Sequence, residues 1–68
     1  MKINPSKIDL IMAEQAITAV ELSKRAGLSR QSISTVKAKG SCTPITAKKI
    51  ALGLGVPVES ICTKEDNT

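Results

Sequence analysis

The sequence predicts an all-α protein that forms one domain over residues 1–63 and ends in a polar, frayed tail at residues 64–68. Two observations predict this class. Five segments space their apolar residues as helices do, without the alternation that is typical of strands, and residues that start or stop helices lie between them. The 68 residues include no Phe, Trp or Tyr, so we expect a core of aliphatic side chains.

The first predicted helix runs from Pro5 to about Ala16. Asn4 is suited to cap it, because its side chain can accept hydrogen bonds from backbone N–H groups that have no partner in the first turn. A proline at the first helical position costs no hydrogen bond, because an N–H at that position would have no partner within the helix. The inward face is defined by Ile8, Ile11 and Met12. Leu10 lies off this face, exposed or in contact with a partner.

The second predicted helix begins at a capping box, Thr18-Ala-Val-Glu21. In such a box the hydroxyl accepts from the Glu21 N–H, and the carboxylate reaches back to the N–H of Thr18. Leu22 and Ala26 point inward, and Gly27 suits the left-handed position that follows a helix. A small residue is needed where this helix crosses the next one, and Ser23 suits that position if its hydroxyl bonds to a carbonyl one turn earlier.

The third predicted helix, residues 29–39, has Ser29 as its cap and ends near Gly40. Ile33 and Val36 share the inward face, where they anchor it to the second helix across a tight turn. The opposite face carries side chains that can hydrogen-bond to base edges: Arg30, Gln31, Ser34 and Thr35. The alternative is a merely solvated face, but solvated helices favour Glu and Lys.

Two more helices complete the pattern. Thr43-Pro44 repeats the start signal, and the fourth helix continues to about Leu54, with Gly55 after it. Its inward residues are Ala47, Ile50, Ala51 and Leu54. Gly53, inside this helix, should cost about 1 kcal/mol relative to alanine. Pro57 opens a short fifth helix whose inward residues are Val58, Ile61 and Cys62.

Positive charge is concentrated in the middle of the chain. Residues 18–49 contain seven Lys or Arg and one acidic residue, whereas the rest of the chain contains three basic and five acidic residues. This distribution is expected of a region that meets a polyanion, although a positively charged soluble surface would look the same.

Several classes of function are disfavoured by composition. There is no His, and two cysteines, Cys42 and Cys62, are too few for a zinc site, so we expect no metal and no cofactor. We interpret both as structural thiols, while the sequence leaves a bridge between them open. No catalytic constellation or phosphate loop indicates an enzyme, and no apolar run is long enough for a membrane span, so we expect a cytoplasmic protein. The missing aromatics also argue against stacking on single-stranded nucleic acid.

The central helices resemble those of the phage repressor and Cro family, the lambda-repressor-like helix-turn-helix proteins. The resemblance rests on TAVELSKRAGLSRQSISTV at residues 18–36, on the TP pair at 43–44 and on IALGLGVPVESI at 50–61. It implies a compact five-helix domain in which the second and third helices form the helix-turn-helix and the third enters the major groove. The implied function is sequence-specific binding of a double-stranded DNA operator by a small transcriptional regulator, most commonly a repressor.

The resemblance also implies roles for individual residues. Those implied to read bases are Arg30, Gln31, Ser34 and Thr35, with a phosphate contact left open for Arg30. Those implied to contact the DNA backbone are Thr18, Ala19, Ser29, Ser32, Lys37, Lys39, Ser41 and Thr43.

The sequence departs from the family pattern at three places. Ala19 replaces a frequent Gln. Met12 and Lys37 stand where the family often pairs an Arg with a Glu, so Lys37 is expected to be free to reach DNA. Gly40 comes one residue later than the usual glycine, before Ser41.

The expected partners are a DNA operator and a second copy of the chain, with no small-molecule ligand. Family members commonly bind as homodimers, and the apolar candidates for that contact around the fifth helix are Leu52, Pro57 and Ile61. A monomer stays open. The alternative function is an antitoxin or antirepressor-like module whose main partner is a protein.

Overall fold

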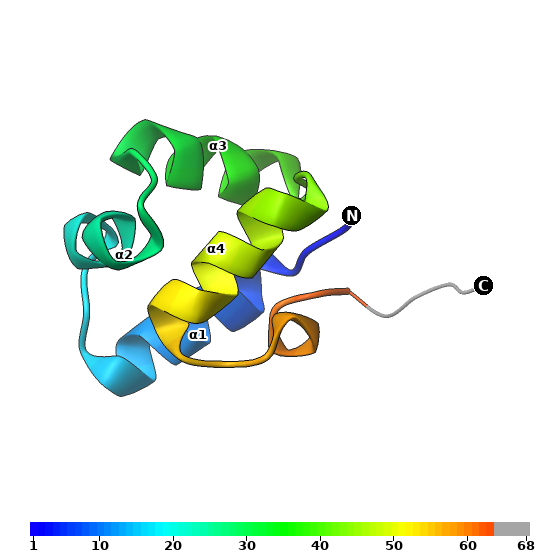
Figure 1. Cartoon of the computed structure of the whole chain (residues 1–68). Helices are drawn as coiled ribbons and strands as arrows, with labels where there is room; N and C mark the ends of the chain where they lie inside the picture. The colour runs from blue at the N-terminus through cyan, green and yellow to red at the C-terminus, as the bar shows by residue number, and fades with distance from the viewer. Residues whose placement is uncertain (64–68) are drawn as a thin grey trace.

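A computed structural model describes residues 1–63 and contains, within that range, four α-helices around an aliphatic core (Figure 1). The helices are α1 (Pro5–Gln15), α2 (Ala19–Ala26), α3 (Arg30–Lys39) and α4 (Pro44–Leu54). The predicted all-α class is confirmed for these residues. The expected tail at 64–68 lies outside them. In the described part of the chain, no helix is long and apolar enough to cross a membrane.

The prediction of a fifth α-helix is wrong. The segment after Pro57 forms one 3-10 turn, η1 (Val58–Ser60). Beyond it the chain becomes extended: Asn4 donates its N–H to the carbonyl of Ile61, and Thr63 donates to the carbonyl of Lys2. These long-range bonds occupy the backbone groups that would otherwise continue a helix.

The predicted starts of the four α-helices are confirmed. In each case the side chain of the cap accepts a hydrogen bond from a backbone N–H two or three residues further on. The four caps are Asn4, Thr18, Ser29 and Thr43. Because each cap satisfies a donor that the helix itself leaves unpaired, the helix boundaries follow closely from the sequence.

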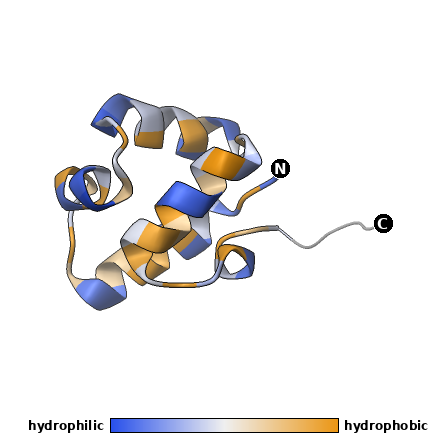
Figure 2. Cartoon of the chain, viewed as in Figure 1, coloured by the Kyte–Doolittle hydropathy of each residue, from blue (hydrophilic) through white to orange (hydrophobic). Residues whose placement is uncertain are grey.

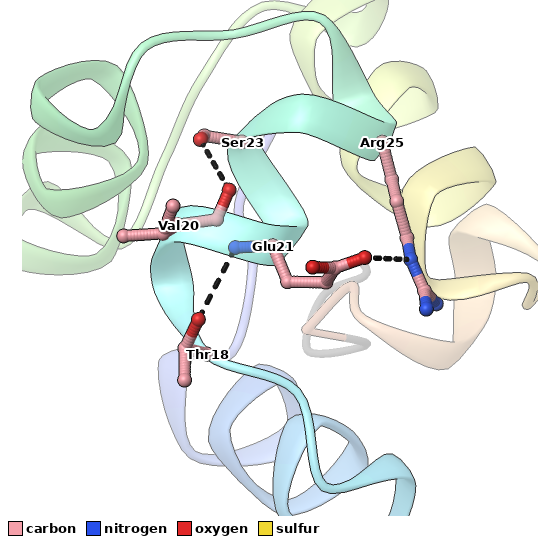
Figure 3. A network of polar contacts seen from close by, with 5 residues as sticks. All are labelled: Thr18, Val20, Glu21, Ser23 and Arg25. Atoms are coloured by element: carbon pink, nitrogen blue, oxygen red, sulfur yellow. Dashed lines mark hydrogen bonds and ion pairs between the residues drawn. The ribbon is translucent and has the colours of Figure 1, made fainter.

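Only half of the predicted capping box at the start of α2 is present (Figure 3). The N–H of Glu21 donates to the hydroxyl of Thr18 at 3.2 Å, as expected. The carboxylate of Glu21, however, accepts from Nε of Arg25 at 3.3 Å, one turn further along. The carboxylate of Glu21 therefore pairs with the guanidinium of Arg25 and not with the N–H of Thr18.

The core is centred on α4, which crosses in front of α1 in Figure 1 and packs against α2. The four inward residues predicted for α4 are all buried, as are Ile8, Met12 and Leu22. Figure 2 shows apolar and polar residues alternating along the helices, so none is apolar all round. At the far end of α4, Nε2 of Gln15 donates to the carbonyl of Leu54 at 2.6 Å and satisfies a terminal acceptor.

The N-terminal segment is an extended piece that the helical pattern does not predict. Residues 1–4 lie between two other extended pieces, with isolated antiparallel bridges from Lys2 to Ser41 and from Ile3 to Cys62. Ile3 is buried in the core at 3% exposure. This segment therefore fastens the α3–α4 connection to the end of the described chain.

Candidate nucleic-acid interface

The turn between α2 and α3 is built as the sequence predicts. Gly27 adopts a positive φ of 71°, which side chains with a Cβ rarely tolerate, and Leu28 donates its N–H to the carbonyl of Ser23. The hydroxyl of buried Ser23 donates to the carbonyl of Val20 at 2.7 Å, as expected (Figure 3). The hydroxyl of Ser23 thus has a hydrogen-bond partner inside the fold. A larger residue at this position would separate α2 from α3.

Two buried side chains hold α3 against the core. Ile33 is 2% exposed and Val36 is 7% exposed, which confirms their predicted role. The four side chains assigned to base reading are all exposed: Arg30, Gln31, Ser34 and Thr35. The helix therefore has a narrow anchored side and a broad free side that carries amide, guanidinium and hydroxyl groups.

A groove of about 450 Å³ runs along one flank of this free side, between α3, residues 41–43 and the start of α4. It contains seven of the twelve residues implied to contact DNA: Ser29, Gln31, Ser32, Thr35, Lys39, Ser41 and Thr43. Arg30 and Ser34 are exposed outside this groove. Thr18 and Ala19, at the start of α2, also lie outside it.

Two hydroxyl pairs line the groove, one at the start of each flanking helix. The hydroxyl of Ser29 donates to that of Ser32, and the hydroxyl of Thr43 donates to that of Thr46, both at 3.0 Å. Each cap also accepts from a backbone N–H. The hydroxyl protons of Ser32 and Thr46 are consequently free to be donated to an outside acceptor.

Thr46 is a groove residue that the sequence reasoning missed. Its signal is the spacing Thr43-Pro-Ile-Thr46, which repeats the Ser29-Arg-Gln-Ser32 pattern at the start of α3. With two helix N-termini and Lys39 beside it, the groove offers donors and positive charge. These properties suit an anionic oxygen such as that of a phosphate.

The expectation that Lys37 is free is wrong. Its ammonium group forms an ion pair with the carboxylate of Asp9 on α1. The Arg–Glu pair of the family pattern is therefore replaced by a pair of opposite polarity, with Lys37 at the Glu position and Asp9, three residues before Met12, as its partner. A phosphate contact by Lys37 stays a prediction, and it requires the ammonium to exchange one anionic partner for another.

Both cysteines are free thiols in the structure. Cys42 lines the groove and is half-buried. Burial raises the pKa of its thiol above the ordinary value of 9.0, although the nearby N-terminal ammonium acts in the opposite direction. The thiol is accordingly protonated at neutral pH and is a poor nucleophile.

The residues assigned to a dimer contact do not form one exposed set. Leu52 is 67% exposed and Pro57 is exposed, but Ile61 has no exposed surface. The expectation that Ile61 is available to a partner is wrong, because its side chain completes the core under the paired N-terminal segment. The other large exposed aliphatic side chains of the helices are Leu10, Val20 and Ile45.

Comparison of the chain with protein-family models, curated proteins and solved structures found no match. The geometry of α3 and its groove is therefore the basis for the function proposed below.

Proposed function

We propose that this protein binds double-stranded DNA sequence-specifically, with α3 in the major groove, and acts as a small transcriptional regulator of the phage repressor and Cro type. One observation carries the proposal: the free side of α3 carries four exposed side chains that match base edges, Arg30, Gln31, Ser34 and Thr35. Gln can pair with adenine and Arg with guanine, while Ser and Thr suit several bases.

The position of α3 supports the same proposal. Figure 1 shows α2 nearly end-on and α3 nearly side-on, so consecutive helices cross steeply over the turn at residues 27–29. A helix-turn-helix needs this arrangement, in which the first helix supports a second one that protrudes. Ile33 and Val36 fasten α3 by one side only, which leaves its other side free for a duplex.

The groove beside α3 supplies contacts of a second kind. A duplex whose bases face Gln31 and Thr35 would bring its sugar-phosphate strand toward the hydroxyls of Ser32 and Thr46 and the ammonium of Lys39. Such contacts position a protein on DNA without reading sequence. The proposed interface thus combines reading and positioning groups on adjacent sides of one helix.

Selection of bound sites from random duplex DNA tests this proposal. We expect an enriched motif, and symmetric half-sites in it would show that the protein binds as a homodimer. Gln31→Ala should then lose roughly 1–3 kcal/mol on the selected site and little on random DNA. Lys39→Gln is the matched contrast, because losing a phosphate contact should weaken binding to both duplexes alike. Equal losses on both duplexes for Gln31→Ala would refute its role in reading bases.

A second candidate is a module of the antitoxin or antirepressor kind that mainly binds a protein. The observation in its favour is the exposure of Leu10, Ile45 and Leu52 on α1 and α4, at 60% to 70%. Substituting these residues should abolish partner binding if this candidate is right. A selection that enriches no DNA motif would favour it over the regulator.

A further inference from the structure

The ion pair between Asp9 and Lys37 places a negative charge beside the proposed recognition helix. Lys37 follows Arg30 by seven residues, so the two side chains leave α3 within about 20° of the same direction. They form the flank opposite to the groove that contains Lys39. A duplex against the free side of α3 would present phosphates along both flanks.

The two flanks are not electrostatically equivalent. On the groove side, Lys39 has no ion partner within residues 1–63, and on the other side Arg30 has none either. Lys37 alone among the basic residues of α3 is held by a carboxylate in that range. Its side chain is 29% exposed and that of Asp9 is 58% exposed, so water and ions reach the pair.

The solvent accessibility of the Asp9–Lys37 pair determines how much it stabilises the fold and how easily a phosphate can compete for Lys37. An exposed ion pair contributes little to folding stability, typically less than about 1 kcal/mol, so the fold does not depend on it. A phosphate that approaches this flank must displace the Asp9 carboxylate from Lys37 and also meets its negative charge. A free lysine, by contrast, would neutralise a phosphate and release a counterion.

Building on the proposed DNA binding, we propose that Asp9 lowers the sequence-independent affinity for DNA by withholding Lys37 from the DNA backbone. The carboxylate lowers the affinity for any duplex, whatever its sequence. Non-operator DNA is then occupied less at a given protein concentration, and the base contacts of α3 must supply the affinity for an operator. Asp9 itself touches no base, and it acts only through Lys37 and through its own charge.

The test compares Asp9→Asn with Glu14→Gln, an equal change of charge at an exposed position of the same helix. Binding to a random duplex is measured by fluorescence anisotropy at several KCl concentrations. Asp9→Asn should bind roughly three- to tenfold more tightly near 0.1 M salt, with a salt slope steeper by about one unit, while Glu14→Gln should change both much less. The affinity ratio between selected and random DNA should stay nearly constant in Asp9→Asn, because a backbone contact strengthens both complexes alike.

A double-mutant cycle separates this role from a structural one. Adding Lys37→Gln to Asp9→Asn should cancel most of the gain, whereas Lys37→Gln alone should change binding to random DNA only slightly. If Asp9→Asn and Glu14→Gln behave alike, or if the gain persists without Lys37, the inference is overturned. If the unaltered protein shows no salt-dependent DNA binding at all, it is the proposed function that fails. Thermal melts confirm that each variant is folded.

Discussion

Replacing Gly53 with alanine should destabilise the domain, although alanine is the better helix former. A Cβ at this position of α4 would lie 3.0 Å from Cδ1 of Leu22, and 3.1 Å and 3.2 Å from N and Cβ of Ala26. Leu22 is completely buried and the nearest atom of Ala26 is backbone, so neither neighbour can move aside without shifting α2. The glycine therefore sets how closely α2 and α4 approach.

The magnitude follows from two opposing terms. Better helix propensity contributes about 1 kcal/mol in favour of alanine. Overpacking a rigid site costs about 1–3 kcal/mol, and contact with two buried neighbours places this site in the upper part of that range. We expect a net loss of about 1–2 kcal/mol, or a decrease in Tm of about 5–15 °C for a domain of this size.

Urea denaturation and thermal melting of Gly53→Ala and Ala38→Gly check this reasoning. Ala38 is exposed and, like Gly53, stands one residue before the end of its helix, so Ala38→Gly measures the propensity term alone. It should lose up to about 1 kcal/mol. If Gly53→Ala instead raises the free energy of unfolding by the amount that Ala38→Gly lowers it, the close approach of α2 and α4 does not restrict this position.

Three further predictions concern stability. Thr18→Ala should lose about 1 kcal/mol in urea denaturation, and Glu21→Ala clearly less, because Thr18 caps α2 while Glu21 pairs with Arg25 in solvent; equal losses would indicate the complete capping box instead. Ala16→Gly should stabilise by about 1 kcal/mol, since Ala16 has a φ of 56° that glycine adopts without strain, and a loss in the melt would contradict that backbone conformation. Burial raises the pKa of the Cys42 thiol in the folded protein, so the unfolded chain releases this proton first as pH rises. The contribution of the protonated thiol to the free energy of unfolding is therefore present below pH 9 and declines above it. Stability should consequently fall more steeply above pH 9 in the unaltered protein than in Cys42→Ala, and parallel curves would refute the shift.

Local signals in the sequence account for most of the helical framework. Caps such as Ser29 and Thr43, and glycines such as Gly27, act within a few residues of their own position, so reading neighbours is enough to place the helix ends. Ile33 and Val36 were predictable for a similar reason, since helical spacing alone puts them on one side of α3.

The features that sequence reasoning missed depend on contacts between distant residues. Ile3 is buried because residues 1–4 pair with two remote segments, and a piece of four residues has no periodicity to detect. The same pairing buries Ile61 and replaces the expected fifth helix by a single turn. The pair of Asp9 with Lys37 and the contact of Gly53 with Ala26 likewise arise only when separate helices meet.

The most direct test of the proposed function is an NMR titration of the labelled protein with the selected duplex, followed through its backbone amides at low and at moderate salt. We expect the largest shift changes along the free side of α3 and at the groove residues near Thr46, little change near Leu52 on α4, and weaker binding at higher salt. Changes centred on the exposed aliphatic residues of α1 and α4, or an affinity that ignores salt, would contradict DNA recognition by α3.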